Sequence, residues 1–348
     1  MYLEQFDRQK VSTFRQWVSE ARHIVLLSHT NADGDACGSI LGMTLQLDRA
    51  ATAAVSVVPI LPNGCPKTFS WMPSSHRILS GEADRQLCER TIAEADLLVC
   101  VDFNAASRID FLADALLYAS GRKVLIDHHI NPATDQFDII FSREISSACE
   151  LALWTSMAMW ERQYLNQEVA TCFYTGLSTD TGGFAYSCED PSCFEAAAIL
   201  VSYNIHAADI HNHIVNTFSI NRMQFYGFAI NERLYIYPEH KTAMFYFSLE
   251  DQRRFHVGGE DMEGLVNYTL MMAEIEVGVL LREEPTRTKV SFRSKYDVNV
   301  NELAKQIGGG GHLKASGATV EKPLAETLEM VKGLLGISGE KHYNFVEA

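Results

Sequence analysis

Histidine and aspartate side chains follow three short apolar segments of the sequence, at the points where the segments end. They form the groups His29-Thr-Asn-Ala-Asp33-Gly-Asp35, Asp102 and Asp127-His128-His129, and another acid, Asp180, stands beside a glycine pair. Carboxylates crowded together raise one another's pKa, so such a group needs protons or divalent cations. A mixed carboxylate and imidazole set suits manganese, magnesium or zinc better than copper. Two such ions about 3.5–4 Å apart would clamp the attacking and leaving oxygens of a phosphate ester.

The apolar segments before these groups are predicted to be strands of one parallel sheet. Residues 23–28, 95–101 and 122–126 are short and rich in β-branched side chains, and an opening helix is expected over residues 6–21. Strands alternating with helices give a parallel sheet with helices on both faces. Because ligands of such sheets bind beyond the carboxyl ends of the strands, the acidic groups stand where a ligand is expected.

A second α/β domain is predicted toward the carboxyl end of the chain. The total of 348 residues exceeds what one ordinary core needs. Helices are expected over residues 150–163 and 190–230, and strands over 242–248, 275–281 and 289–292. We therefore expect domains at 1–187 and 231–348, joined by a helical linker at 188–230.

Composition restricts the class of partner. The formal net charge of −15 argues against a protein that coats long duplex nucleic acid, although local cations would still allow a small anionic substrate. The sequence has no long apolar run for a membrane span and no signal-like apolar stretch at its start, so we expect a cytoplasmic protein without a membrane partner. The eight cysteines lack a CxxC pair and are expected to be reduced, with Cys37 and Cys100 as small core residues.

Each acid taken alone also has an ordinary structural explanation. An aspartate after a strand is often a helix N-cap, and the stretch from Asp33 to Gly38 is ordinary turn chemistry. Four separate segments that all carry metal-capable residues are harder to explain in this way. His206, His211 and His213 lack a carboxylate pairing, so we expect them on a solvated helix.

A run of four glycines, Gly308–Gly311, precedes His312 and is expected to form a loop. It is not a Walker A loop, because Lys314 does not directly follow the last glycine, and this disfavours an ATPase. Its amides could form an anion-binding nest, or the run could be a tight interdomain turn. Arg108 and Arg293 could each hold a phosphate or simply lie on the surface.

Several of these segments resemble the motifs of DHH phosphoesterases and of the DHHA1 domain that accompanies them. The DHH-like residues are His29, Asp33, Asp35, Asp102, Asp127-His128-His129 and Asp180, and the DHHA1-like stretches are Ser291-Phe-Arg293-Ser, Val300–Ala304, Gly308–His312 and Ala315-Ser-Gly317-Ala. The motifs occur in the expected order over most of the chain. Within the family the sequence is most similar to the compact nano-RNase A type, bifunctional oligoribonucleases that also dephosphorylate 3′-phosphoadenosine 5′-phosphate (PAP).

The resemblance implies a catalytic DHH domain, a smaller substrate-binding DHHA1 domain, and an active site in the cleft between them. It implies two divalent cations, manganese first and magnesium as the alternative. One would be held by His29, Asp33 and Asp102, and the other by Asp35, Asp102, His128 and Asp180. Asp127 would orient the site and His129 would face the scissile phosphate, so the expected catalytic residues are Asp102, Asp127, His128 and His129. Substrate contacts are expected from His129, Arg108, Arg293, Gly309, Gly310, Gly311 and His312.

The activity that this resemblance implies is hydrolysis of short oligoribonucleotides, two to five nucleotides long, to nucleoside 5′-monophosphates, together with conversion of PAP to AMP. The expected partners are short single-stranded RNA or DNA and nucleoside bisphosphates, with a homodimer as one assembly. Alternatives are a cyclic or linear dinucleotide phosphodiesterase and a non-catalytic nucleotide sensor. An inorganic pyrophosphatase ranks low, because its carboxyl-terminal domain would lack the glycine run ending in His312.

Overall fold

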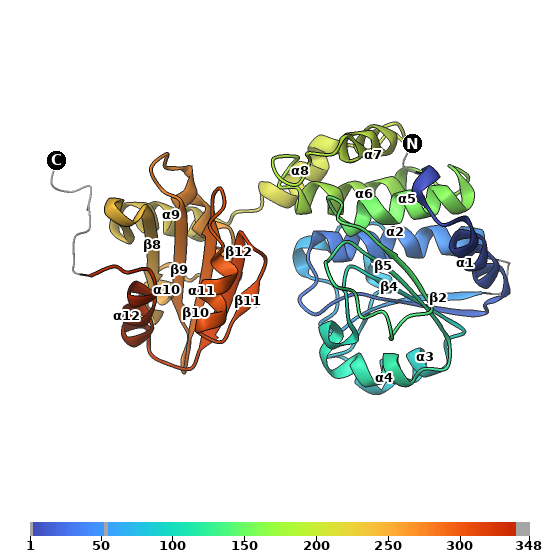
Figure 1. Ribbon diagram of the computed structural model, residues 1–348, viewed down its shortest axis with the longest axis horizontal. Coiled ribbons are helices and arrows are strands. Elements are labelled where there is room, and N and C mark those ends of the chain that lie inside the picture. Colours follow the sequence, from blue (N-terminus) through green and yellow to red (C-terminus); the bar gives the residue numbers. More distant parts are fainter. Residues whose placement is uncertain (1–2, 52–54, 339–348) are drawn as a thin grey trace. The chain divides into compact units, whose positions relative to one another are not determined.

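The computed structural model describes residues 3–51 and 55–338, and the chain divides into two compact units, Met1–Thr217 and Phe218–Ala348 (Figure 1). This confirms the prediction of two α/β domains. The boundary between the units falls inside the stretch predicted as a helical linker, residues 188–230. Within the described residues, no helix is both long enough and apolar enough to cross a membrane.

Unit 1 is built on a six-stranded parallel sheet with the order β3-β2-β1-β4-β5-β6. Its strands are β1 (His23–Leu27), β2 (Ser56–Leu61), β3 (Leu79–Ser80), β4 (Leu97–Val101), β5 (Arg122–Asp127) and β6 (Ile139–Ser142). The three strands predicted from the sequence, β1, β4 and β5, lie side by side in the middle of the sheet. They are buried on both faces, which explains their nearly continuous apolar sequences.

Helices cover both faces of this sheet (Figure 1). Helices α1 (Arg8–Glu20), α2 (Gly34–Ala50) and α5 (Ala148–Trp160) lie on one face, and α3 (Arg85–Ala93) and α4 (Ala113–Tyr118) lie on the other. Helix α6 (Gln167–Asp180) packs on α2 and α5, and α7 (Pro191–Val201) and α8 (Ala207–Val215) pack on α6. The unit also has 3-10 turns at Leu3–Gln5, Lys67–Phe69, Ser75–Arg77 and Ala106–Leu112. Side chains of β1 alternate between two cores. Ile24 and Leu26 pack with residues of α1, α2, α5 and α6, whereas Val25 and Leu27 pack with residues of α3 and α4.

Helices α2 and α6 approach each other closely through glycines. Gly34, Gly38 and Gly42 recur every four residues of α2 and therefore share one face of that helix. A Cβ atom on Gly38 would lie 2.5 Å from a backbone carbonyl oxygen of α6, and one on Gly176 of α6 would lie 2.7 Å from a carboxylate oxygen of Asp35. The absence of these side chains lets the first turn of α2 sit against the carboxyl-terminal half of α6.

The stretch 190–230, predicted to be helical, forms α7, α8 and α9 (Ile220–Glu232), of which α9 belongs to unit 2. His206, His211 and His213 are exposed at or on α8, as expected for a solvated helix. The ring of His213 also stacks on Trp71, with 4.4 Å between ring centroids and 14° between planes.

Unit 2 contains a mixed sheet with the order β11-β12-β10-β9-β8-β7. Its strands are β7 (Leu234–Tyr237), β8 (Thr242–Phe247), β9 (Val277–Glu283), β10 (Thr288–Ser294), β11 (Gly310–Gly311) and β12 (Ala315–Val320), and its helices are α9, α10 (Leu249–Phe255), α11 (Val300–Gln306) and α12 (Leu324–Leu334), with 3-10 turns at Pro238–His240, Glu260–Met262 and Leu265–Met271. Strands β8 and β9 pair in parallel and the other neighbours are antiparallel. Strands β8, β9 and β10 correspond to the three predicted from the sequence.

The glycine run differs from the predicted loop. Gly310 and Gly311 form β11 and pair with β12, whereas the reversal of the chain comes later, where the amide of His312 donates to Ala315 O at 2.8 Å. Gly308 has a φ of 79°, in the left-handed region. A Cβ atom on Gly311 would lie 2.6 Å from the carbonyl oxygen of Ala315. Two of these glycines are therefore explained by the fold of the run itself.

Candidate metal centre

The sheet of unit 1 gathers most of the predicted site at its carboxyl edge. His29 follows β1, Asp102 follows β4, and His128 and His129 follow β5. The strand order reverses between β1 and β4, and the carboxyl edge at such a reversal is where open α/β sheets bind ligands. The remaining acids come from helix ends next to this edge, because Asp35 lies in the first turn of α2 and Asp180 ends α6.

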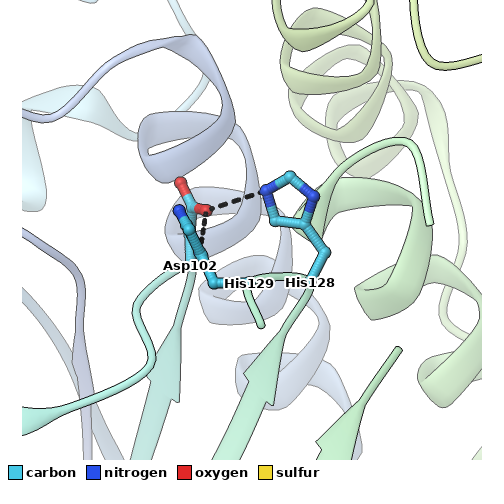
Figure 2. Close-up of side chains that lie close together, drawn as sticks. All are labelled: Asp102, His128 and His129. Carbon is cyan, nitrogen blue, oxygen red and sulfur yellow. Dashed lines mark ion pairs between the residues drawn. The ribbon is translucent and has the colours of Figure 1, made fainter. Parts of the chain in front are cut away.

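Asp102 lies at the centre of this cluster. Its Oδ2 is 3.3 Å from Nε2 of His29, and its Oδ1 is 3.6 Å from Nε2 of His128 and 3.9 Å from Nδ1 of His129. Figure 2 shows its carboxylate with dashed lines to the rings of His128 and His129. The side chain is buried, and the backbone has a φ of 61°, which is uncommon for a residue other than glycine. Such strained positions concentrate at functional sites.

The charges around Asp102 are strongly coupled. Burial raises the pKa of Asp102, but hydrogen bonds with His128 and His29 outweigh burial and hold the pKa well below its usual range. Burial lowers the pKa of His29, but Asp102 and the more distant Asp33 raise it to about 9. The pKa of His128 is likewise raised well above its ordinary value, because Asp102 and Asp35 outweigh the effect of burial. Asp102 and the two imidazoles therefore favour one another's charged forms.

A second group of carboxylates surrounds His128. Its Nε2 is 3.9 Å from Oδ2 of Asp35 and 3.5 Å from Oδ2 of Asp180. Burial raises the pKa of Asp35 well above its ordinary value, and the charges of Asp102 and Asp180 raise it further. Burial also raises the pKa of Asp180, to about 7, with Asp102 adding to burial and His128 opposing it. This part of the site concentrates more negative charge than the nearby imidazoles neutralise.

Asp33 is both a helix cap and a member of the cluster. Its Oδ1 accepts hydrogen bonds from the amides of Asp35 and Ala36, each at 3.0 Å, so it is the N-cap of α2. The same oxygen lies 4.0 Å from Nε2 of His29, and the side chain is 58% exposed. The cap uses one of the two carboxylate oxygens. The role of Asp33 as the N-cap of α2 is therefore compatible with a role as a metal ligand.

The donor atoms form sets that fit divalent cations. The sets are His29, Asp33 and Asp102; Asp35, His128 and Asp180; and Asp102, His128 and His129, and within each set the ligand atoms lie within 4.8 Å of one another. Asp102 connects the first two sets, because Oδ2 faces His29 and Oδ1 faces His128. Carboxylate oxygens suit manganese and magnesium, whereas imidazole nitrogens suit transition metals better than magnesium. The crowding of carboxylates fits positively charged occupants.

Asp127 lies behind the cluster and holds His129. Its side chain is fully buried, and Oδ1 is 2.7 Å from Nδ1 of His129. Oδ2 is also buried and has no hydrogen-bond partner among the described residues. A buried carboxylate at this distance fixes the orientation of the ring, as outer carboxylates do for catalytic and metal-binding histidines.

Sequence reasoning missed the start of α5 as part of the site. The amides of Ala148 and Cys149 donate to Asp35, and Nδ1 of His128 lies 3.2 Å from the carbonyl oxygen of Ile145. These contacts come from the main chain, so no residue type marks them. The pattern Ser147-Ala-Cys-Glu150, an N-cap serine followed by glutamate at the third helical position, is the signal that locates this helix start.

The predicted substrate residues lie in different parts of the chain. Arg108 is an exposed residue of unit 1 whose carbonyl oxygen accepts from the amide of Thr30 at 3.0 Å, next to His29. Arg293 belongs to β10 of unit 2 and pairs with Ala315 of β12, close to the strand formed by Gly310 and Gly311. Burial lowers the pKa of Arg293, and its Nη1 donates to Phe292 O at 3.0 Å. Gly309 and His312 flank β11 in the same unit.

Comparison with known proteins identifies the family. Residues 23–177 match the DHH family, N-terminal domain, and residues 242–336 match the DHHA1 domain. The crystal structure of an exopolyphosphatase-related protein from Bacteroides fragilis is similar with a TM-score of 0.91 and 34% identity, covering 95% of this chain and 96% of that one. Two relatives are named bifunctional oligoribonuclease and PAP phosphatase NrnA. The relative from Bacillus subtilis is 28% identical over 85% of this chain and 89% of its own length, and the relative from Thermus thermophilus is 26% identical over 86% and 84%. This chain belongs to the DHH family and carries an N-terminal DHH domain followed by a DHHA1 domain.

Proposed function

We propose that this protein is a divalent-cation-dependent phosphoesterase that hydrolyses short oligoribonucleotides to nucleoside 5′-monophosphates and converts PAP to AMP. One observation carries the proposal: a buried aspartate, Asp102, connects two adjacent sets of metal-capable side chains. The names of the two relatives, which are similar along most of their length, support the choice of substrates.

The cluster provides ligands for two cations. His29, Asp33 and Asp102 would hold one, and Asp35, Asp102, His128 and Asp180 would hold the other. Manganese is the first candidate, because carboxylates suit it and, as a transition metal, it also accepts the imidazole present in both sets; magnesium is the alternative. Two divalent cations lower the pKa of water and stabilise negative charge on phosphoryl oxygens when they are bound in this way.

The protein's own residues orient the substrate and handle protons. Nδ1 of His129 lies 2.7 Å from Oδ1 of Asp127, and this contact orients the ring, which would face the scissile phosphate. The buried carboxylate of Asp127 holds the ring in place, as the aspartate of a catalytic triad does for its histidine. During hydrolysis, water adds to phosphorus, the ester bond to the sugar oxygen breaks, and the leaving oxygen takes a proton.

The second domain would bind the part of the substrate away from the scissile bond. Arg293 and the exposed edge at Gly310 and Gly311 are the candidates, together with His312. Guanidinium and backbone amides are suitable donors to phosphate. The net charge of −15 disfavours long polyanions, which agrees with substrates that carry few phosphates.

The test is release of mononucleotides from a 5′-labelled diribonucleotide in the presence of manganese. PAP, a cyclic dinucleotide and pyrophosphate are assayed in parallel, together with Asp102→Ala and the exposed-site control Asp114→Asn. We expect rapid cleavage of the linear dinucleotide and of PAP, lost with Asp102→Ala and kept with Asp114→Asn. Preference for the cyclic dinucleotide would favour the alternative phosphodiesterase. Absence of hydrolysis of every substrate, with two metals bound, would refute the proposal in favour of a nucleotide sensor.

A further inference from the structure

We propose that Glu150, acting with Ser146, is a positioning residue of the metal centre. These two residues fix the start of α5 so that its main chain orients Asp35 and His128, two ligands of the same proposed cation. The inference rests on the metal centre of the proposed function. Neither residue belongs to the metal-ligand sets of the site.

Asp35 is held by the amino terminus of α5. Its Oδ2 accepts from the amide of Ala148 at 2.6 Å and its Oδ1 from the amide of Cys149 at 2.8 Å. The first amides of a helix have no partner within the helix and carry partial positive charge, so they bind a carboxylate well. Both oxygens of a side chain that is only 1% exposed are thereby fixed in direction.

His128 is oriented by the residue that precedes this turn. Its Nδ1 lies 3.2 Å from the carbonyl oxygen of Ile145, which can only accept a hydrogen bond. The contact therefore selects the form of the ring with hydrogen on Nδ1, and Nε2 faces Asp102, Asp35 and Asp180. A histidine ligand is ordinarily held in this way by a hydrogen bond from its other nitrogen.

Glu150 controls the direction of that carbonyl group. The carbonyl of Ile145 and the amide of Ser146 belong to one planar peptide unit, so fixing one end fixes the other. Oε2 of Glu150 accepts from the amide of Ser146 at 3.3 Å and also from its hydroxyl group. Glu150 thus binds the N–H group of the peptide unit whose carbonyl oxygen contacts His128.

The arrangement departs from an ordinary helix cap. Ser147 caps α5 by accepting from the amide of Glu150 at 3.0 Å, as in a capping box. In that motif the glutamate would reach back to the amide of the cap residue. Here it binds the preceding residue, Ser146, and its Oε1 accepts from Nε1 of Trp154 at 3.0 Å. Glu150 is fully buried, which is costly for a carboxylate unless donors surround it.

Glutamine cannot reproduce these contacts. Donors face both oxygens of Glu150, and an amide group offers an oxygen to one side and an NH2 group to the other. In Glu150→Gln, either the Ser146 side or the Trp154 side would therefore place a donor against a donor. We expect the peptide unit to turn and the ring of His128 to lose its fixed orientation.

The test is calorimetric titration of the metal-free full-length protein with manganese. In Glu150→Gln, affinity for the cation held by Asp35 and His128 should fall about 10- to 100-fold, the usual effect of losing a partner of a metal ligand. Affinity for the cation held by His29 should change less than about twofold. Asp180→Asn removes a ligand of the cation held by Asp35 and His128 only, so it shows which step of the titration belongs to that cation. The exposed-site variant Glu195→Gln is the matched control.

A second variant separates positioning from loss of folding. Trp154→Phe removes the indole N–H donor. In the double variant Glu150→Gln/Trp154→Phe, the NH2 group of the glutamine therefore meets no donor at position 154, and its oxygen can face Ser146. We expect the double variant to bind the affected cation more tightly than Glu150→Gln alone. Thermal unfolding of the metal-free variants is measured alongside.

Unchanged affinity in Glu150→Gln would overturn the inference. Equal weakening of both sites would also overturn it, because that result indicates a general structural role. If the wild type binds two manganese ions but hydrolyses no nucleotide, the proposed function fails, and the difference in affinity still decides whether Glu150 positions the ligands.

Discussion

Replacing Gly38 by alanine should damage the core and the metal centre together. The new Cβ atom would lie 2.5 Å from the carbonyl oxygen of Cys172 and 3.0 Å from the amide nitrogen of Gly176. Both are backbone atoms of α6 and cannot rotate away. Restoring an ordinary contact of about 3.4 Å requires α2 and α6 to separate by close to 1 Å at this point. Overpacking of this kind costs about 1–3 kcal/mol of stability.

The same separation changes the metal centre, because Asp35 lies on α2 and Asp180 on α6. Metal–ligand distances tolerate only about 0.2 Å of change, so the ligands must move to compensate. We expect a thermal midpoint lower by about 2–12 °C, from a shift of about 2–4 °C for each kcal/mol in a domain of this size. Weaker manganese binding should accompany it. Thermal unfolding and calorimetric titration of the metal-free protein measure the two effects.

A matched control is available in unit 2. Gly227 lies inside α9, and a Cβ atom there would meet nothing within 4 Å. Gly227→Ala should leave stability unchanged or raise it by up to about 1 kcal/mol, because alanine favours a helix more than glycine does. If Gly38→Ala were as stable as Gly227→Ala and bound manganese like the wild type, the argument from close helix contact would be wrong.

Three further predictions concern single contacts. Asp127→Asn should lower kcat for the diribonucleotide by about 10²-fold or more while leaving the thermal midpoint almost unchanged, because it weakens the contact that orients His129. Wild-type kcat would contradict that role. Gly310→Ala should leave the thermal midpoint unchanged, because a Cβ atom there meets only a side-chain oxygen at 3.9 Å. It should raise KM if β11 approaches the substrate. Gly311→Ala, by contrast, should lower the thermal midpoint. Burial raises the pKa of Asp251, but hydrogen bonds from Arg233 and Ser248 outweigh it and lower the pKa. This stabilisation is present above the unfolded pKa of about 3.9 and is lost as pH falls through the folded value, so Asp251→Asn should flatten the decline of the thermal midpoint in acid.

The central strands could be predicted because burial on both faces gives them a nearly continuous apolar sequence. The other strands of unit 1 have a weaker sequence pattern. Strand β2 contains Pro59, which cannot donate to a strand ladder and is unusual inside a sheet. Strand β3 has only two residues, Leu79 and Ser80, which is too short for any periodicity.

The gathering of the acidic and histidine side chains could be predicted because strand ends share one edge of the sheet, but the supporting contacts could not. Arg108 was predicted from its charge, whereas its contact with Thr30, next to His29, is made by its carbonyl group. Ile145 likewise acts through a main-chain oxygen. Such contacts depend on the path of the backbone, and any residue type could make them. The glycine run was misjudged because glycine is typical of loops but also permits close approach of two strands.

The glycine contact between α2 and α6 should also affect how ions exchange at the proposed metal centre. Asp35 is supported by packed helices. The conformational entropy lost in bringing the ligands together is therefore offset by folding of the chain and not by binding of the ion. A zinc finger, by contrast, folds only when its metal binds. Ions should therefore leave and enter this site without unfolding it, and one divalent cation should replace another on the time scale of ligand exchange.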